Sequence, residues 1–323
     1  MRGIFGITFV ACFSALLTVA QGQSYPQKPV TIVVSWPPGS SPDIFARILS
    51  PRLQQTFGKP FIVENKPGAG GVVAARGVLA APPDGHTLLL ADTPLMILAP
   101  HLVKNLGYEP LKAFRPISSI GRLPYVFASS ASSRIKSIDD LIRVAKANPG
   151  KLNYGSPGVG TAHHIIMEAF KKSTGVEITH VPYKGATQLN SALISGEVDI
   201  AVTSIATLSS QGSMGAVNVL GVTTRDRFPS VPNVPAISEV VEDFDFTAEQ
   251  GVVASAGVPD EIINRLAAAI GAALGDPEVQ STFRKLDVLP FFGGPHEYGA
   301  SLRVYSEKYD KVIKAANIEL TDP

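Results

Sequence analysis

Short apolar runs rich in β-branched residues alternate along the chain with stretches in which apolar residues recur every three to four positions. In the first third of the sequence, the runs and the stretches that follow them are 30–34 with 42–57, 61–63 with 70–81, and 87–90 with 94–104. Strand-length runs followed by helical spacing are typical of βαβ units, whose strands pair in parallel. The pattern therefore predicts an α/β fold with a mostly parallel sheet.

The same alternation resumes after an extended segment at 117–128. The second series comprises predicted strands at 152–154, 178–181, 198–203 and 217–222 and predicted helices at 137–147, 161–174 and 186–195. A further extended stretch, 247–254, leads to helices at about 259–274, 277–286 and 296–316. Two series joined by two extended segments predict two lobes with two crossover strands. We expect lobe 1 to comprise 23–121 and 247–323, and lobe 2 to comprise 122–246, with the last helices returning to lobe 1.

The first 22 residues have the pattern of a secretory signal peptide. Arg2 supplies a positive charge, residues 4–19 are mostly apolar, and Ala20-Gln21-Gly22 provides small residues for cleavage. The apolar part is too short for a membrane span. Cleavage would remove Cys12, the only cysteine, so the mature protein would have neither a disulfide nor a thiol site. An exported chain without cysteine is expected in a bacterial periplasm.

Charge and motif spacing argue against several functional classes. The net charge is +1, which gives no attraction to nucleic acid or to an anionic membrane. Tyr154 stands where a Gly-x-Ser-x-Gly nucleophile motif around Ser156 would need glycine, and no Walker lysine follows a glycine loop. His164 and Glu168 are four residues apart, but no third ligand stands at zinc-site spacing. The sequence therefore predicts no catalytic residues, no metal and no cofactor.

The segment Ser35-Trp36-Pro37-Pro38-Gly39-Ser40-Ser41-Pro42-Asp43 joins the first predicted strand to the first predicted helix. Ser41 suits the N-cap position and Pro42 the first helical position. Such a helix begins at the carboxyl end of a strand, where open α/β sheets bind ligands, and its free N–H groups attract anions. Gly39 allows a ligand to approach closely, and Ser40 adds a donor. The alternative is an ordinary rigid βα turn.

A second loop, 153–161, has a similar design in the second series. Ser156, Gly158 and Gly160 precede Thr161, which can cap the next helix. Two such loops, one in each lobe, could hold a small anion from both sides.

Other positions carry alternatives that the sequence leaves open. Residues 64–71 are interpreted as a tight connection that packs a helix against the sheet. Thr93 follows a strand and could face the cleft. Lys184 reaches a ligand or pairs with Asp199, and Trp36 forms a wall for a flat ligand or packs in the core. His164 donates to the cleft or packs beneath it, whereas His163 is expected to face solvent.

A set of longer motifs then resembles one known family. The motifs are Tyr25-Pro26 through Ala46-Arg47, Glu64 to Gly71, Pro83-Asp84-Gly85-His86-Thr87-Leu88, Asn153 to Ser156 with Gly158, Gly160 and His164, Val181 to Gly185, Gly196 to Asp199, and Arg227 to Pro235. In order and spacing they are similar to the periplasmic solute receptors of tripartite tricarboxylate transporters, the Bug family, over nearly all of the mature chain.

This resemblance implies a type II periplasmic-binding-protein fold that closes by a hinge on a small carboxylate. It also implies a monomeric receptor that delivers its ligand to the permease subunits of a membrane transporter, without a cofactor. By position, the implied ligand-binding residues are Trp36, Pro38, Gly39, Ser40, Ser41, Asp43 and Thr93 in the first lobe and Ser156, Gly158, Thr161, His164, Lys184 and Ser204 in the second.

One departure from the family pattern affects the expected ligand. The family commonly has Pro-Pro-Gly-Gly in the first loop, whereas Ser40 replaces the second glycine here and narrows the pocket or supplies a donor. With Trp36 nearby, we expect an aromatic carboxylate such as terephthalate more than a citrate-like or amino-acid ligand. The alternative functions are a receptor for a membrane signalling sensor and a periplasmic hydrolase or isomerase.

Overall fold

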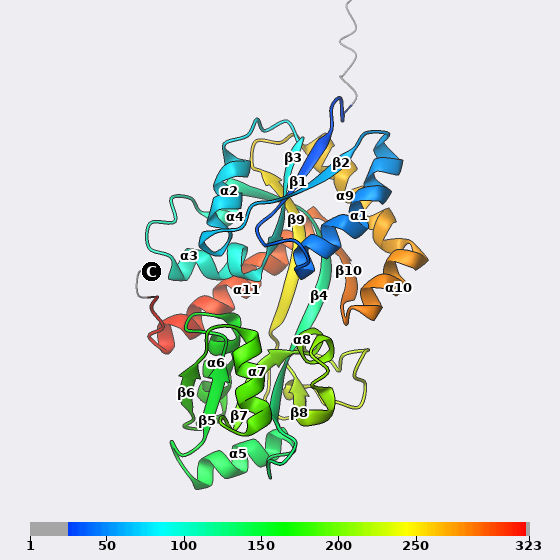
Figure 1. Ribbon diagram of the computed structural model, residues 1–323. Helices are drawn as coiled ribbons and strands as arrows, with labels where there is room; N and C mark the ends of the chain where they lie inside the picture. The colour runs from blue at the N-terminus through cyan, green and yellow to red at the C-terminus, as the bar shows by residue number, and fades with distance from the viewer. Residues whose placement is uncertain (1–24, 321–323) are drawn as a thin grey trace, which may run out of the picture.

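The computed structural model describes residues 25–320, which form two lobes joined by long strands (Figure 1). The signal peptide expected at residues 1–22 lies outside this range. Within it, none of the helices has the length and apolarity needed to cross a membrane.

One mixed sheet runs through both lobes. Its strands are β1 (Val30–Val34), β2 (Phe61–Asn65), β3 (Thr87–Asp92), β4 (Phe114–Ser130), β5 (Asn153–Ser156), β6 (Thr179–Pro182), β7 (Ile200–Ser204), β8 (Val217–Val222), β9 (Thr247–Ser255) and β10 (Leu289–Gly293). They follow the order β2-β1-β3-β9-β4-β7-β5-β6, and β8 and β10 also pair with β4. The β2-β1-β3 and β7-β5-β6 groups are parallel, whereas β4, β9 and β10 add antiparallel pairs.

The helices cover the two faces of this sheet. They are α1 (Ser41–Phe57), α2 (Val72–Leu79), α3 (Ala99–Leu102), α4 (Pro110–Ala113), α5 (Ile138–Ala147), α6 (Ala162–Thr174), α7 (Ala186–Ser195), α8 (Ile205–Ser210), α9 (Asp260–Gly275), α10 (Pro277–Lys285) and α11 (Pro295–Ala315), with the short turns η1 (Ala69–Gly71), η2 (Pro94–Leu98), η3 (Met214–Ala216) and η4 (Ile237–Glu239). The helix expected over 94–104 is present from Pro94 to Leu102, but its first part, η2, is π-helical, and α3 ends at Leu102, two residues before the expected end. Pro100 cannot donate a backbone hydrogen bond, which interrupts a regular ladder there.

Strand β4 passes from one lobe to the other. Its residues 114–124 pair with β9, whereas Tyr125 and the residues after it pair with β7. The change of partner falls at Pro124, which has no N–H to donate to a ladder. β4 and β9 are therefore the crossover strands of the two-lobed fold (Figure 1).

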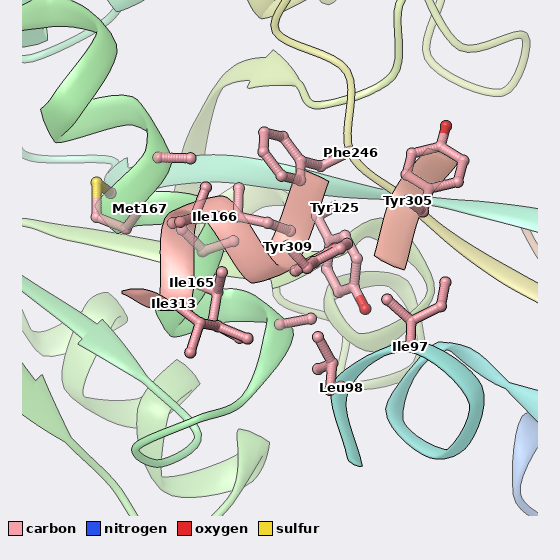
Figure 2. Packing of buried hydrophobic residues seen from close by; sticks show 14 of the residues in the cluster. Ile97, Leu98, Tyr125, Ile165, Ile166, Met167, Phe246, Tyr305, Tyr309 and Ile313 are labelled. Atoms are coloured by element: carbon pink, nitrogen blue, oxygen red, sulfur yellow. The ribbon is translucent and has the colours of Figure 1, made fainter. Parts of the chain in front are cut away.

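Helix α11 links the cores of the two lobes. Its residues Tyr309 and Ile313 belong to the same buried cluster as Ile165 of α6 and Ile97 of η2. Figure 2 shows α11 side chains packed between those two elements. Burying side chains of this size contributes about 1.5–3 kcal/mol each. The start of α6, in the second lobe, is therefore anchored to the first lobe through a large apolar contact.

Candidate functional site

Two cavities lie between the lobes, on either side of residues 36–39. The first, called here the Trp36 cavity, has a volume of about 510 Å³. It is lined by Trp36, Ala69, Gly70, Pro94, Leu98, Ala99, Leu102, Val103, Tyr125, Pro157, Val159, Gly160, Thr161, Ala162, His163, Ala186 and Leu320. The second, the Ser41 cavity, has a volume of about 490 Å³. It is lined by Gly39, Ser41, Ile44, Phe45, Leu123, Ser204, Ala206, Thr207, Ser209, Lys285, Leu286, Asp287 and Val288.

The arrangement differs from the expected grip by two loops on one anion. The start of α1 lines the Ser41 cavity, whereas the start of α6 lines the Trp36 cavity. The N-cap of α1 is Ser40 rather than Ser41, so the expected helix start is shifted by one residue. The Ser40 hydroxyl donates to the carbonyl of Pro37 at 2.7 Å and does not cap the helix.

The first-lobe loop is fixed by Asp43, whose side chain is almost fully buried. Its carboxylate accepts hydrogen bonds from the Gly39 N–H at 2.8 Å, the Asn65 amide at 2.9 Å and the Arg47 guanidinium at 3.0 Å. Burial alone would raise the pKa of this carboxyl, but these hydrogen bonds lower it to about 2. Asp43 thus holds the loop, and the positive φ of 83° at Gly39 allows the turn that brings its N–H to the carboxylate.

Trp36 is a wall residue of the cavity, with 38% of its surface exposed. Its indole N–H donates to the carboxylate of Asp92 at the end of β3. Asp92 also accepts from the Leu95 N–H at 3.1 Å, at the start of η2. Burial raises the pKa of Asp92, while the two N–H donors act in the opposite direction.

The second-lobe loop is held by hydroxyl groups. The Ser156 hydroxyl accepts from the Gly158 N–H at 3.2 Å and lies 2.7 Å from Nε2 of His180. The Thr161 hydroxyl donates to the Gly158 carbonyl at 2.8 Å and accepts from the His164 N–H at 3.4 Å, which caps α6. Ser156 is fully buried, so it supports the loop from behind.

Of the two adjacent histidines, His163 has the opposite of its expected orientation, whereas His164 adopts the second of its two expected alternatives and packs beneath the loop. His163, expected to face solvent, lines the Trp36 cavity and packs edge-on against Tyr125, with ring centroids 4.8 Å apart. His164 lies behind the loop, where Nδ1 accepts from the Gly160 N–H at 3.2 Å and the ring stacks on His180 at 4.0 Å. Burial lowers the pKa of His163 to about 4 and also lowers that of His164.

The remaining candidates lie at different depths. Thr93 is buried and its hydroxyl bonds to the backbone of Glu249 in β9, so it does not line either cavity. Lys184 is exposed, and among the described residues it forms no ion pair with Asp199, which instead accepts from the Asn153 N–H at 2.8 Å. Pro38 is exposed beside the cavities. Ser204 lines the Ser41 cavity and caps α8.

Several lining residues escaped the sequence interpretation. Tyr125 lies within the continuous apolar run of β4, and Leu320 lies beyond the last helix. The turn at 68–71 does pack tightly, since a Cβ on Gly71 would lie 3.1 Å from that of Ser35. The same turn also exposes Ala69, with a positive φ of 46°, to the Trp36 cavity. The positive φ of a non-glycine residue marks this turn as unusual, but a backbone angle can be seen only in the structure, so the sequence contained no signal for Ala69.

The chemistry of the Trp36 cavity is that of a binding site. Its lining contains no Lys, Arg, Asp or Glu, and no cluster of three potential metal ligands occurs within residues 25–320. The polar attraction comes from the first turn of α6, where the N–H groups of Ala162 and His163 have no helical acceptor. The cavity therefore offers one anion-attracting point in an otherwise apolar space.

Two lobes, two crossover strands and a cavity between the lobes are the architecture of periplasmic solute-binding proteins. Residues 45–318 match the family described as "Tripartite tricarboxylate transporter family receptor", and the chain belongs to this family. Because the family and its structural neighbours are solute-binding proteins, the chain is a binding protein and not an enzyme.

Curated relatives are similar over almost the whole chain. A "UPF0065 protein in gbd 5'region" of Cupriavidus necator is 34% identical over 96% of this chain and 94% of its own length. Protein BugT of Bordetella pertussis is 28% identical over 99% of this chain and 98% of its own length.

Solved structures with the same fold include two with carboxylates. A protein of R. palustris solved with adipate is 30% identical, with a TM-score of 0.77, covering 92% of this chain and 100% of the other. MatC of Rhodopseudomonas palustris, with bound malate, is 27% identical, with a TM-score of 0.72, covering 90% of this chain and 100% of the other. A TctC solute-binding protein of Polaromonas, at 24% identity, has a TM-score of 0.80 with 90% and 100% covered and shares the fold.

Proposed function

We propose that this protein captures a small carboxylate in the Trp36 cavity, in the periplasm, and delivers it to the permease subunits of a tripartite tricarboxylate-type transporter. The observation that carries the proposal is the start of α6, whose first residues line an apolar cavity between the lobes and whose first-turn N–H groups attract anions. Family membership supports the transport role. Adipate and malate in two relatives support a carboxylate as the ligand class.

The lining favours a ligand with an apolar body. Trp36, Tyr125 and His163 present aromatic surface, and most other lining residues are aliphatic. Aromatic side chains contribute large apolar contact area and specific ring geometry. We therefore retain the aromatic carboxylate as the preferred ligand class, with terephthalate as its first example. A tricarboxylate such as citrate, with its additional hydroxyl group, would leave several polar groups without partners, which is costly.

The candidate residues divide into two groups by position. Trp36, Thr161 and His163 would contact the ligand in the Trp36 cavity, and Ser41 and Ser204 lie in the neighbouring Ser41 cavity. The loop-supporting group comprises Gly39, Ser40, Asp43, Ser156, Gly158 and His164, whereas Thr93 bonds to the backbone of β9. In this proposal the second group orders the loops before the ligand arrives, which reduces the entropy lost on binding.

We further propose that residues 23–121 with 247–323 move as lobe 1 and residues 122–246 as lobe 2. Closure would then bend β4 and β9 near Pro124 and Thr247, which face each other in the register. The receptor would act as a monomer.

The direct test is a thermal-shift screen of the refolded mature protein, residues 23–323, against aromatic and aliphatic carboxylates. A ligand that binds only the folded state, at 100 times its Kd, should stabilise the protein by about 2.7 kcal/mol. A rise in melting temperature with one chemical group of acids would support the proposal. Thr161→Ala should make this ligand-induced rise smaller. The proposal fails if no acid shifts the melting temperature after bound ligand has been removed by unfolding.

A further inference from the structure

The chain that follows α11 makes a defined turn. α11 ends at Ala315, and Asn317 has a positive φ of 49°. The Ile318 N–H donates to the Ile313 carbonyl at 3.0 Å, and the Asn317 N–H donates to the Lys314 carbonyl at 3.3 Å. These two hydrogen bonds and the left-handed residue form a Schellman motif. The motif fixes the direction in which the chain leaves the helix.

The same segment is anchored before it reaches the Trp36 cavity. Ile318 is 7% exposed and belongs to the buried cluster that also contains Ile313, the apolar contact that commonly accompanies this motif. Leu320, two residues further on, is half-buried, packs against the same cluster and lines the Trp36 cavity. Leu320 is therefore a wall residue whose position is set by the turn and by the buried side chain before it.

Leu320 has little room to retreat from a ligand. A Cβ on Gly160 would lie 2.7 Å from Cδ2 of Leu320 and 3.3 Å from Cδ1 of Leu102. The Leu320 side chain thus packs against the Gly160 main chain with Leu102 of α3 beside it, and all three residues line the cavity. Inserting extra atoms against close-packed side chains costs about 1–3 kcal/mol, because rotamers or backbone must shift. A ligand that extends to this wall would meet that cost.

The wall around Leu320 is aliphatic. Leu98, Leu102, Val103 and Val159 line the same cavity. Contacts with such a wall depend on the size of the apolar body of a ligand. In an apolar pocket, one methylene group too many or too few changes the affinity by about 10- to 200-fold. The side chain of Leu320 is large enough to produce a difference of this order.

From these contacts, and resting on the proposed function, we infer that Leu320 is a specificity-determining residue that limits the length of the carboxylate that the Trp36 cavity accepts. Leu320 contacts the apolar body of a long ligand and leaves a short one unaffected. Acids of the length of terephthalate or adipate are then preferred to their extended analogues. The C-terminal segment thereby belongs to the binding site, together with α3 and the loop at 153–161.

The test compares ligands that differ in length and keep their charge. Calorimetric titration of the refolded mature protein uses terephthalate with its longer naphthalene and biphenyl analogues, and in parallel adipate with the longer diacids suberate and sebacate. The measured quantity is the ratio of Kd between the longest and the shortest acid of each series. We expect this ratio to be at least about tenfold higher in the wild-type protein than in Leu320→Ala, in which the wall is shortened to a methyl group.

Matched variants separate the wall from a general loss of packing. Leu79→Ala removes the same group from another half-buried leucine, which packs against the same buried cluster but lines neither cavity. It should leave the ratio unchanged. Leu320→Ile conserves the volume, so its ratio should stay within about threefold of wild type. Leu320→Val shortens the side chain less than alanine does and should lower the ratio by a smaller amount.

The outcomes distinguish this inference from the proposed function. If Leu320→Ala binds acids but keeps the wild-type ratio, or if it changes the affinity for short and long acids equally, the specificity role of Leu320 is wrong and carboxylate capture stands. An equal fall of the ratio in Leu79→Ala would also contradict that role. If the wild-type protein and the variants bind no acid of either series, carboxylate capture in this cavity is wrong, and the role of Leu320 falls with it.

Discussion

The two loops that bring helix starts to the cleft perform the same task with different chemistry. In the first lobe, residues 36–41 are held by the charged carboxylate of Asp43 and its partner Arg47. In the second lobe, residues 156–161 are held by the hydroxyls of Ser156 and Thr161 and by neutral imidazoles behind them. The first loop depends on the charge of a single residue, Asp43. The second loop depends on several hydrogen bonds between neutral groups. Acid should therefore affect the two loops in different pH ranges.

The loops also differ in the space around them. A Cβ on Gly39 would meet nothing within 4 Å, whereas a Cβ on Gly160 would lie 2.7 Å from Leu320 at the end of the described chain. The first loop is thus open to solvent, and the second is enclosed by the α3 side chain Leu102 and the C-terminal segment. This contrast yields four tests, which follow in decreasing order of expected effect.

The largest effect is expected for Asp43→Ala. Removing this buried carboxylate takes an acceptor from the Gly39 N–H and the Asn65 amide and breaks the ion pair with Arg47. The change should lower the free energy of unfolding by about 3 kcal/mol. Urea denaturation measures the change. Asp43→Asn, which keeps one acceptor oxygen, should lose less. A loss below about 0.5 kcal/mol in Asp43→Ala would show that the first loop does not depend on this charge.

The pH dependence of stability should separate the two loops. Burial, reinforced at His180 by the neighbouring His164, lowers the pKa of His163 and His180 from 6.5 to about 4. The unfolded chain therefore binds more protons between these values, and stability falls as the pH drops from about 6.5 to about 4. For Asp43, lowered from 3.8 to about 2, the contribution is present above 3.8 and lost only as the pH falls toward 2.

Two variants test which residue causes the loss of stability in each pH range. His163→Phe keeps an aromatic ring against Tyr125 and should reduce the stability lost between pH 6.5 and 4 by about 2 kcal/mol, measured by denaturation at several pH values. Asp43→Asn should leave that range unchanged and flatten the curve below pH 4. An unchanged curve in His163→Phe would mean that this imidazole is already accessible to protons in the folded state.

A smaller effect is expected for glycine substitutions. Gly160 and Gly39 have positive φ values of 75° and 83°, so alanine at either position costs about 1–2 kcal/mol in backbone strain. Only Gly160→Ala also displaces Leu320, and it should in addition weaken carboxylate binding by about tenfold through the shifted wall, roughly 1.4 kcal/mol. Shortening the obstructing side chain in Gly160→Ala with Leu320→Ala should restore part of the affinity. Equal binding by Gly39→Ala and Gly160→Ala would contradict the enclosed second loop.

These positions also show how far the sequence could be interpreted. Local signals were sufficient where a residue acts on its own helix: Thr161 is the N-cap of α6, and Pro42 lies in the first turn of α1. Helical spacing could not tell His163 from His164, because both stand at the boundary of the apolar face. The role of Asp92 could not be predicted locally, because the hydrogen bond that it accepts comes from the indole of Trp36, 56 residues earlier.

The two-lobed fold was easier to predict than the site, because its signals are local and the contacts of the site are not. Alternation of apolar runs and helical stretches is repeated many times, so an error in one element, such as the end of the helix that begins at Pro94, does not change the architecture. A cavity wall instead depends on a few side chains that come from distant segments, such as Tyr125 and Leu320. The bend of β4 and the course of the C-terminal segment decide those contacts, and neither has a periodic signal.

The smallest effect compares the two N-caps directly. The Thr161 hydroxyl accepts from a helix N–H, so Thr161→Ala should cost about 1 kcal/mol of stability and also weaken ligand binding at the first turn of α6. The Ser40 hydroxyl makes no such bond and donates instead to Pro37 at the surface. Ser40→Ala should therefore change stability by no more than about 0.5 kcal/mol. Both residues occupy the N-cap position of their helices. Equal losses of stability in the two variants would therefore mean that the capping hydrogen bond of Thr161 does not stabilise the second loop. The stability of that loop would then have to come from the stacked rings of His164 and His180.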